Sequence, residues 1–218
     1  MPLADQTIID FSALEKAQII AEPFPFAVVS GFLRPETAME ISHDFPRVDF
    51  PGSVPLQDLE FGPMFGKLIK ELEGDRLRQA IESKFDLSLT NRPTLITVRG
   101  RTRARDGRIH SDTKSKLITL LLYFNLKWES DAGRLRILRD AENLEDYVQE
   151  IPPTFGTCLI FKVTENCWHG HKPYEGERRA IQLNYLSDQT ALKQHLSKHH
   201  LSARLKSWKR WFSTQDEY

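Results

Sequence analysis

Cysteine is scarce in this sequence, with only Cys158 and Cys167 in 218 residues. Two cysteines are too few for a disulfide framework, so we expect a chain that folds in the reducing cytoplasm. The formal net charge is zero, because 30 basic side chains balance 30 acidic ones, and this balance predicts no general attraction to nucleic acid or membranes. No apolar run approaches the length of a membrane span, and we expect no signal peptide at the N-terminus.

The sequence does have enough apolar material for a folded core. Its hydrophobic content of 40% over 218 residues fits one globular domain. Residues 24–33 predict a strand that runs into a turn, and Pro35 and Pro46 bracket a predicted helix. Residues 63–85 have apolar residues at helical spacing on both sides of a glycine, which predicts two helices, the second of them capped by Asp75.

The middle of the chain is rich in short β-branched and aromatic runs separated by turn residues. These runs predict strands at residues 95–100, 116–125, 134–140, 158–163 and 179–186. Because most of them have no long helical pattern between them, antiparallel pairing is favoured over a βαβ order. Only residues 141–151 look helical or irregular. The predicted fold class is mainly β with flanking helices (α+β), as a double-stranded β-helix or jelly roll.

The last segment differs from the rest and predicts a basic amphipathic helix. Its apolar positions are Leu192, Leu196, Leu201, Leu205 and Trp208. We predict one domain over residues 1–187, with helical support at about 33–86 and a jelly-roll core at about 94–187, followed by a helical extension over 188–218. The extension is expected to pack on the domain. Contact with a partner, nucleic acid or a membrane surface, and a homodimer, remain alternatives.

Three of the seven histidines fall at the edges of predicted strands, where sites are often built: His110, His169 and His171. His110 and Asp112 are two residues apart, so an extended backbone would point both side chains to one face. Alone this is a weak signal, but a later histidine would supply a third ligand. Two histidines and one carboxylate suit non-haem Fe(II), because they leave coordination positions open. Arg178 would provide a planar cation for a carboxylate.

These residues are accompanied by four segments, namely "LLLYFN" (120–125), "AGRLRIL" (132–138), "PPTFGTCLIF" (152–161) and "HGHKPYEGER" (169–178). Their order and spacing resemble the prolyl-4-hydroxylase-like branch of the Fe(II)/2-oxoglutarate-dependent oxygenases. That family has an HxD motif, a distal His, and an Arg or Lys about ten residues later. The resemblance covers roughly residues 22–187. The sequence departs from the family pattern at Ala132, which replaces a glycine, and at His171, which replaces an apolar residue.

The resemblance implies an enzyme, a dioxygenase that hydroxylates an unidentified amino-acid residue, peptide or small molecule and releases succinate and CO2. It implies that His110, Asp112 and His169 are the metal ligands. It also implies that Arg178 pairs with the distal carboxylate of 2-oxoglutarate, while Tyr123 donates a hydrogen bond to it. The cofactors would be Fe(II), 2-oxoglutarate and O2, with ascorbate as a supporting reductant.

Several alternatives stay open at this point. His171 competes with His169 as the distal ligand, although Pro173 lies where the family places a proline after the ligand, which favours His169. A cupin-type site is a second alternative, since His169, His171 and Glu175 form an H-x-H-x-x-x-E run. A zinc hydrolase lacks the further ligands that it would need, and a non-catalytic binding module on the same fold remains an alternative function.

An alternating arginine stripe leads into the HxD motif: Arg99, Arg101, Arg103 and Arg105. On an extended strand all four side chains would share one face. One interpretation is the entrance for an anionic small-molecule or peptide substrate. The other is a charged sheet edge that discourages strand pairing. Nucleic acid is not an expected partner.

Overall fold

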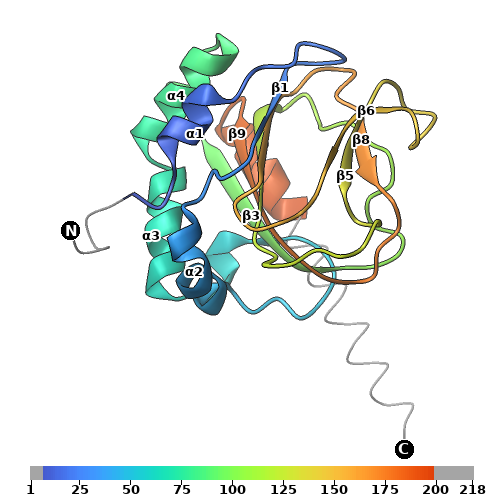
Figure 1. Cartoon of the computed structure of the whole chain (residues 1–218). Helices are drawn as coiled ribbons and strands as arrows, with labels where there is room; N and C mark the ends of the chain where they lie inside the picture. Colours follow the sequence, from blue (N-terminus) through green and yellow to red (C-terminus); the bar gives the residue numbers. More distant parts are fainter. Residues whose placement is uncertain (1–6, 199–218) are drawn as a thin grey trace, which may run out of the picture.

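The structure is a computed structural model that describes residues 7–198. It has three layers: helices at the left of Figure 1, a six-stranded sheet in the middle, and a three-stranded sheet at the right. The large sheet has the order β1-β7-β4-β9-β3-β2 and the small one β6-β5-β8, and every paired strand is antiparallel. Two facing antiparallel sheets with this strand order confirm the predicted jelly roll.

The large sheet contains β1 (Phe26–Val29), β2 (Val54–Pro55), β3 (Thr94–Thr102), β4 (Lys116–Tyr123), β7 (Cys158–Lys162) and β9 (Gly176–Leu186). The small sheet contains β5 (Leu135–Leu138), β6 (Tyr147–Ile151) and β8 (His169–His171). All six segments that the sequence predicts as strands, including residues 24–33, contain one. Residues 141–151 were expected to be helical or irregular, and this is wrong for their end. Tyr147–Ile151 forms a strand that pairs with β5. Pairing and packing in a sheet outweigh the weak local preference of these residues.

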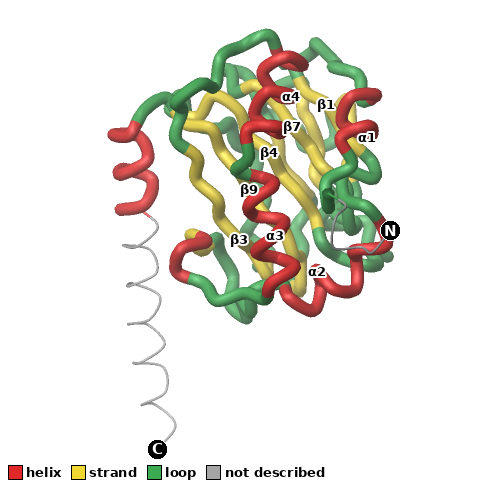
Figure 2. Tube along the Cα trace, turned by 90° about the vertical axis from the view of Figure 1, so that its left-hand side faces the viewer, coloured by secondary structure: helices red, strands yellow, loops and turns green. Residues whose placement is uncertain are grey.

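The helices are α1 (Phe11–Lys16), α2 (Ala38–Asp44), α3 (Pro63–Leu72) and α4 (Asp75–Phe85), with short 3-10 turns η2 (Pro35–Thr37) and η3 (Leu56–Asp58). Figure 2 shows α3 and α4 crossing one face of the large sheet. The two predicted helices on either side of the glycine are confirmed. Asp75 does not cap the second one, however, because Gly74 is the N-cap and Asp75 instead pairs with Arg78 at 2.8 Å.

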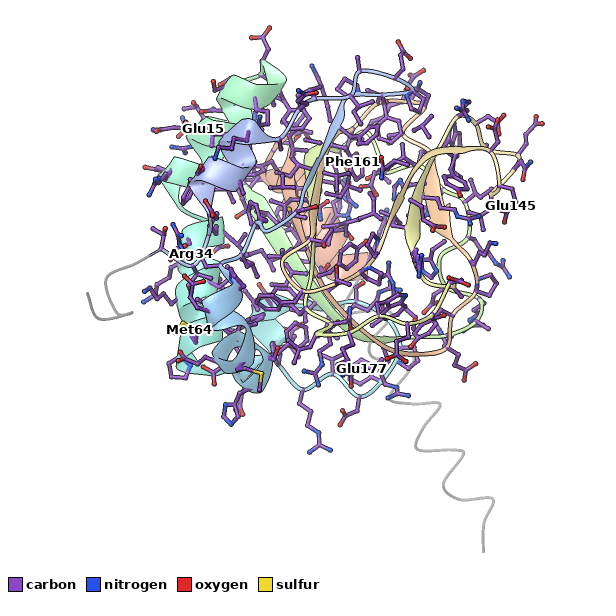
Figure 3. The ribbon with its side chains drawn as sticks, viewed as in Figure 1. Glu15, Arg34, Met64, Glu145, Phe161 and Glu177 are labelled. Atoms are coloured by element: carbon purple, nitrogen blue, oxygen red, sulfur yellow. The ribbon has the colours of Figure 1, made fainter. Side chains whose placement is uncertain are left out.

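Side-chain alternation along β9 divides the core into two parts. Ile181 and Leu183 point to the helices and join the larger apolar cluster, whereas Ala180 joins the cluster between the two sheets. Phe161 of β7 is fully buried in this second cluster (Figure 3). Because alternate residues of a strand face opposite sides, Arg178 must share the face of Ala180. The strand therefore carries a charged residue into the space between the sheets.

Beyond β9, residues 189–198 are helical. Leu192 and Leu196 pack near Leu95 and Leu186, at the edge of the large sheet. This is the expected packing of the first turns of the extension. The predicted apolar positions at Leu201, Leu205 and Trp208 lie outside the described residues. Within the part of the chain that the structure describes, no helix is both long and apolar enough to cross a bilayer.

Candidate active site

The chain brings together His110, Asp112 and His169, each with a ligand atom within 4.8 Å of the other two. His110 and His169 exchange two backbone hydrogen bonds of 3.0 Å, and their ring centroids are 4.3 Å apart. In residues 7–198 this is the one group of three or more His, Cys, Asp or Glu side chains that is arranged to hold a metal ion. Two imidazole nitrogens and one carboxylate are the donor set that suits Fe(II).

Backbone carbonyls orient both rings for metal binding. Nδ1 of His110 lies 2.8 Å from the carbonyl oxygen of Arg108, and Nδ1 of His169 lies 2.8 Å from that of Cys167. A carbonyl can only accept, so each Nδ1 carries a proton and each Nε2 is left as a free donor atom for a metal. Burial, with His110 close by, lowers the pKa of His169 to about 4. His169 is therefore neutral near pH 7, as a metal ligand must be.

Asp112 is held by two neighbours on β4. Lys116 Nζ lies 2.8 Å from its Oδ1, and the Thr119 hydroxyl donates to its Oδ2 at 2.5 Å. Burial alone would raise the pKa of Asp112, but the charge of Lys116 and these hydrogen bonds outweigh it and hold the pKa below its usual value. Lys116 follows a loop but is not a solvated side chain, because only 13% of it is exposed.

The spacing of the HxD motif suggested an extended strand, but the motif does not lie on a regular strand. Only His110 takes part in a β-bridge, and Asp112 lies in the loop between β3 and β4. The two side chains converge because the bridge to His169 fixes one residue and the contacts to β4 fix the other. A spacing of two residues is compatible with several backbone conformations, so the sequence could not distinguish them.

His171 is buried but is separate from this group. Its Nδ1 lies 2.8 Å from the carbonyl oxygen of Lys172, and burial together with the charge of Arg178 lowers its pKa to about 4. Glu175, the carboxylate of the alternative cupin-type set, is exposed. Among the residues described, His169, His171 and Glu175 do not form a group that could share a metal.

The ring of His171 packs on Gly107, which leads to a stability prediction. Gly107 has φ of +82°, and a Cβ at this position would lie 2.3 Å from the Cε1 and Nε2 atoms of His171. Gly107→Ala therefore combines a left-handed backbone with a clash against a buried ring. We expect a loss of about 2–4 kcal/mol in the free energy of unfolding, measured by urea denaturation.

A matched control separates the two contributions. Gly31 has φ of +70°, but no atom of the residues that the structure describes would lie within 4 Å of a Cβ there. Gly31→Ala should therefore show only the backbone cost of about 1–2 kcal/mol. Equal losses for Gly31→Ala and Gly107→Ala would contradict the packing of His171 against Gly107.

Arg178 lines the same cavity as His110 and His169 and has no acidic partner in residues 7–198. Its side chain is buried; Nε donates to the carbonyl oxygen of Gly133 at 2.8 Å, and NH2 lies 3.4 Å from the hydroxyl of Tyr123. Among the described residues, no carboxylate lies within 4.0 Å of its guanidinium. Burying an unpaired charge is costly, so this arginine has the properties of a site for a ligand carboxylate.

One cavity of about 110 Å³ joins these groups, with His110, His169, Arg178 and Tyr123 all in its wall. Gln182 and Arg99, the first residue of the arginine stripe, also line it. Asn184 is buried outside this wall, with its Oδ1 3.0 Å from the Thr119 hydroxyl. The nearby aromatic residues Trp128 and Tyr174 contact each other with tilted rings, whose centroids are 4.6 Å apart, and are not part of this wall.

The arginine stripe is not built as expected. β3 ends at Thr102, and its register shifts between Arg99 and Arg101. The prediction that the side chains from Arg99 to Arg105 share one face of an extended strand is therefore wrong, because a β-bulge changes the side-chain alternation. Of the four arginines, only Arg99 reaches the cavity. Asp106, which no motif of the sequence marks, pairs with both Arg103 and Arg99.

Part of the chain matches the sequence model of a known protein family. Residues 101–186 match the sequence model of the 2OG-Fe(II) oxygenase superfamily, a range that contains His110, Asp112, Tyr123, His169 and Arg178. No curated protein matches this sequence. Proteins of the superfamily use Fe(II), 2-oxoglutarate and O2. The match to its sequence model confirms the prediction of these three cofactors.

Solved structures agree on the fold. A prolyl-4-hydroxylase from Pseudomonas putida is 18% identical with a TM-score of 0.52, over 75% of this chain and 88% of that one. HygX from Streptomyces hygroscopicus, solved with nickel and 2-oxoglutarate bound, is 16% identical with a TM-score of 0.51, over 74% and 81%. AviO1 from Streptomyces viridochromogenes Tue57 is 14% identical with a TM-score of 0.50, over 84% and 97%. The predicted resemblance is confirmed by the family match and by the fold.

Proposed function

We propose that this protein is an Fe(II)- and 2-oxoglutarate-dependent dioxygenase that hydroxylates its substrate and releases succinate and CO2. The observation that carries the proposal is that one cavity is lined both by His110 and His169, which form a group with Asp112, and by the buried residue Arg178. A metal site alone would fit many proteins, and a buried arginine alone would fit many anions. Together they match a cosubstrate that needs a metal at one end and a cation at the other.

The residues present fit Fe(II). His110 and His169 would bind it through Nε2, because Nδ1 of each donates to a carbonyl. Asp112 would bind it through a carboxylate oxygen, while Thr119 and Lys116 keep that carboxylate oriented and ionised. When bound, the iron and its cosubstrate supply the oxidising chemistry, and the chain supplies the positions of the ligands and a shielded cavity.

Arg178 would bind the distal carboxylate of 2-oxoglutarate. Its Nε is already used by Gly133, so the remaining guanidinium nitrogens are left for the ligand. Tyr123 is fully buried beside it, and burial raises the pKa of its hydroxyl, although Arg178 partly opposes this. A protonated hydroxyl next to a guanidinium gives the carboxylate two kinds of donor. Ala180 and Leu121 line the same cavity and keep water away from the pair.

The hydroxyl of Thr119 provides a test of how Asp112 is held. Thr119→Val keeps the volume of this buried side chain but removes its hydrogen bond to the carboxylate. We expect the Kd for Fe(II) to rise about 10-fold, because an outer hydrogen bond orients the ligand. Anaerobic calorimetric titration with Fe(II) measures it. Thr157→Val is the matched control, since Thr157 is also buried but bonds to Thr154. A similar rise in both variants would contradict this role of Thr119.

The reaction itself is tested by product analysis. The protein is incubated with Fe(II), 2-oxoglutarate, O2 and a metabolite extract, and products are measured by mass spectrometry. We expect a product heavier than its substrate by one oxygen atom, formed together with succinate in equal amount. Formation of this product without 2-oxoglutarate would contradict the proposal.

We further infer that residues 1–187 form one oxygenase domain and that 188–218 extend it. The shared core supports this division, because residues of α1, α3 and α4 pack in one cluster with β3, β4 and β9. The helix at 189–198 contacts that domain through a separate small cluster.

A further inference from the structure

Arg99 is a second cation in the cavity, and the proposed cosubstrate does not need it. It lies on β3 opposite Ala180 of β9, so its side chain enters the same space as Arg178. Burial, with the like charge of Arg178 nearby, lowers the pKa of Arg99. A position beside another guanidinium is unfavourable for a cation unless an anion is provided for it.

The neighbours of Arg99 leave much of its charge uncompensated. Its NH1 lies 3.6 Å from Asp106 Oδ2, which is too long for a hydrogen bond. Asp106 already accepts hydrogen bonds from the backbone N–H of Arg103 at 3.0 Å and from its guanidinium at 3.1 Å. One carboxylate therefore serves two arginines. The only hydrogen bond of the Arg99 side chain among the described residues goes to the Ser53 hydroxyl, at 3.2 Å.

The wall around Arg99 is polar as well. Ser53, Thr97 and Gln182 line the cavity with it. Thr97 is 4% exposed, and no described residue offers its hydroxyl a hydrogen bond. A hydroxyl in the cavity wall, beside a guanidinium whose carboxylate neighbour lies 3.6 Å away and is shared with Arg103, is an arrangement that a bound oxyanion would complete.

We propose that Arg99 binds an anionic group of the substrate, a carboxylate or a phosphate, with the Ser53 and Thr97 hydroxyls as further donors. This inference rests on the proposed function, because it assigns the two carboxylates of 2-oxoglutarate to the metal and to Arg178. When 2-oxoglutarate fills those two sites, Arg99 is still available in the cavity wall to bind a second molecule. The substrate is therefore an anion whose reacting carbon lies toward His110 and His169.

The test uses the anaerobic complex of the protein with Fe(II) and 2-oxoglutarate. Its visible charge-transfer band is followed during titration with acetate and, separately, with inorganic phosphate, at constant ionic strength set with chloride. We expect a saturable change in the band with at least one of the two anions. The anion that is effective distinguishes a carboxylate from a phosphate substrate.

Arg99→Gln should raise the Kd for that anion about 10-fold or more, because a charge-assisted hydrogen bond is lost. Arg99→Lys keeps the charge and should be intermediate. Arg101→Gln is the matched control, since Arg101 is an exposed arginine of the same strand, and should behave as wild type. Circular dichroism spectra and thermal denaturation of each variant verify that it is folded.

Three results would overturn the inference. The first is no saturable change with either anion, and the second is a change that persists in Arg99→Gln. The third is a rise in the Kd for 2-oxoglutarate in Arg99→Gln as large as that in Arg178→Gln, which would assign Arg99 to the cosubstrate. Absence of the band in the wild-type complex is a different result, because it would contradict the proposed function itself.

Discussion

Replacement of His169 by alanine is expected to raise the Kd for Fe(II) more than about 100-fold, whereas replacement of His171 leaves it nearly unchanged. His169 lies with His110 and Asp112 in one group that could hold a metal ion, and its Nε2 is available as a ligand atom. His171 lies outside that group and packs on Gly107. Losing a ligand costs more than losing an outer hydrogen bond, which typically costs 10- to 100-fold. Anaerobic calorimetric titration of each variant with Fe(II) measures the difference.

The pair His169→Ala and His171→Ala is its own control, because both histidines are buried and are in the same short strand, β8. Both variants lose a buried ring, so a general loss of packing would affect them alike. The opposite order of Fe(II) affinities would make His171 the ligand. His110→Ala extends the test, since a cupin-type site would keep its metal in that variant and the site described above would lose it.

Arg178→Gln is expected to raise the Kd for 2-oxoglutarate about 100-fold while Fe(II) affinity stays the same. The change removes a buried charge that pairs with a carboxylate, and such an interaction is worth about 1.5–3 kcal/mol, or about one to two factors of ten. The effect should lie near the upper end, because the site is buried and the cation has no other acidic partner among the described residues. Titration of the Fe(II)-loaded protein with 2-oxoglutarate measures it.

Arg179→Gln is the matched control for this variant. Arg179 is the next residue on the same strand, but it points to the other face, where it pairs with Glu177 at 3.0 Å. Its replacement should leave the Kd for 2-oxoglutarate unchanged. If both variants bind 2-oxoglutarate as tightly as the wild type, Arg178 is not the anchor.

Much of the fold could be predicted from the sequence, because runs of β-branched and aromatic residues between turn residues mark strands reliably. β4, β7 and β9 were predicted in this way. β8 is only three residues long, His169–His171, and has no pattern of its own. It forms because Leu135 and Ile137 of β5 offer it pairing partners, which is information that local sequence does not contain.

The residues of the site could be named from motifs, but their environment could not. His110, Asp112 and His169 were named from spacing and resemblance, and the structure places them together; their role as iron ligands stays a prediction. The contact of Lys116 with Asp112 was not foreseen, because a lysine after a loop is usually solvated. The isolation of Arg99 from the rest of its stripe follows from a bulge in β3, which the alternating arginines did not reveal.

The visible absorption spectrum of the anaerobic protein with Fe(II) and 2-oxoglutarate tests the central claim most directly. A weak charge-transfer band should appear only when protein, metal and cosubstrate are all present. It should disappear in His169→Ala and require far more 2-oxoglutarate in Arg178→Gln. A wild-type protein that binds Fe(II) but shows no band at saturating 2-oxoglutarate would contradict the claim that one cavity holds both.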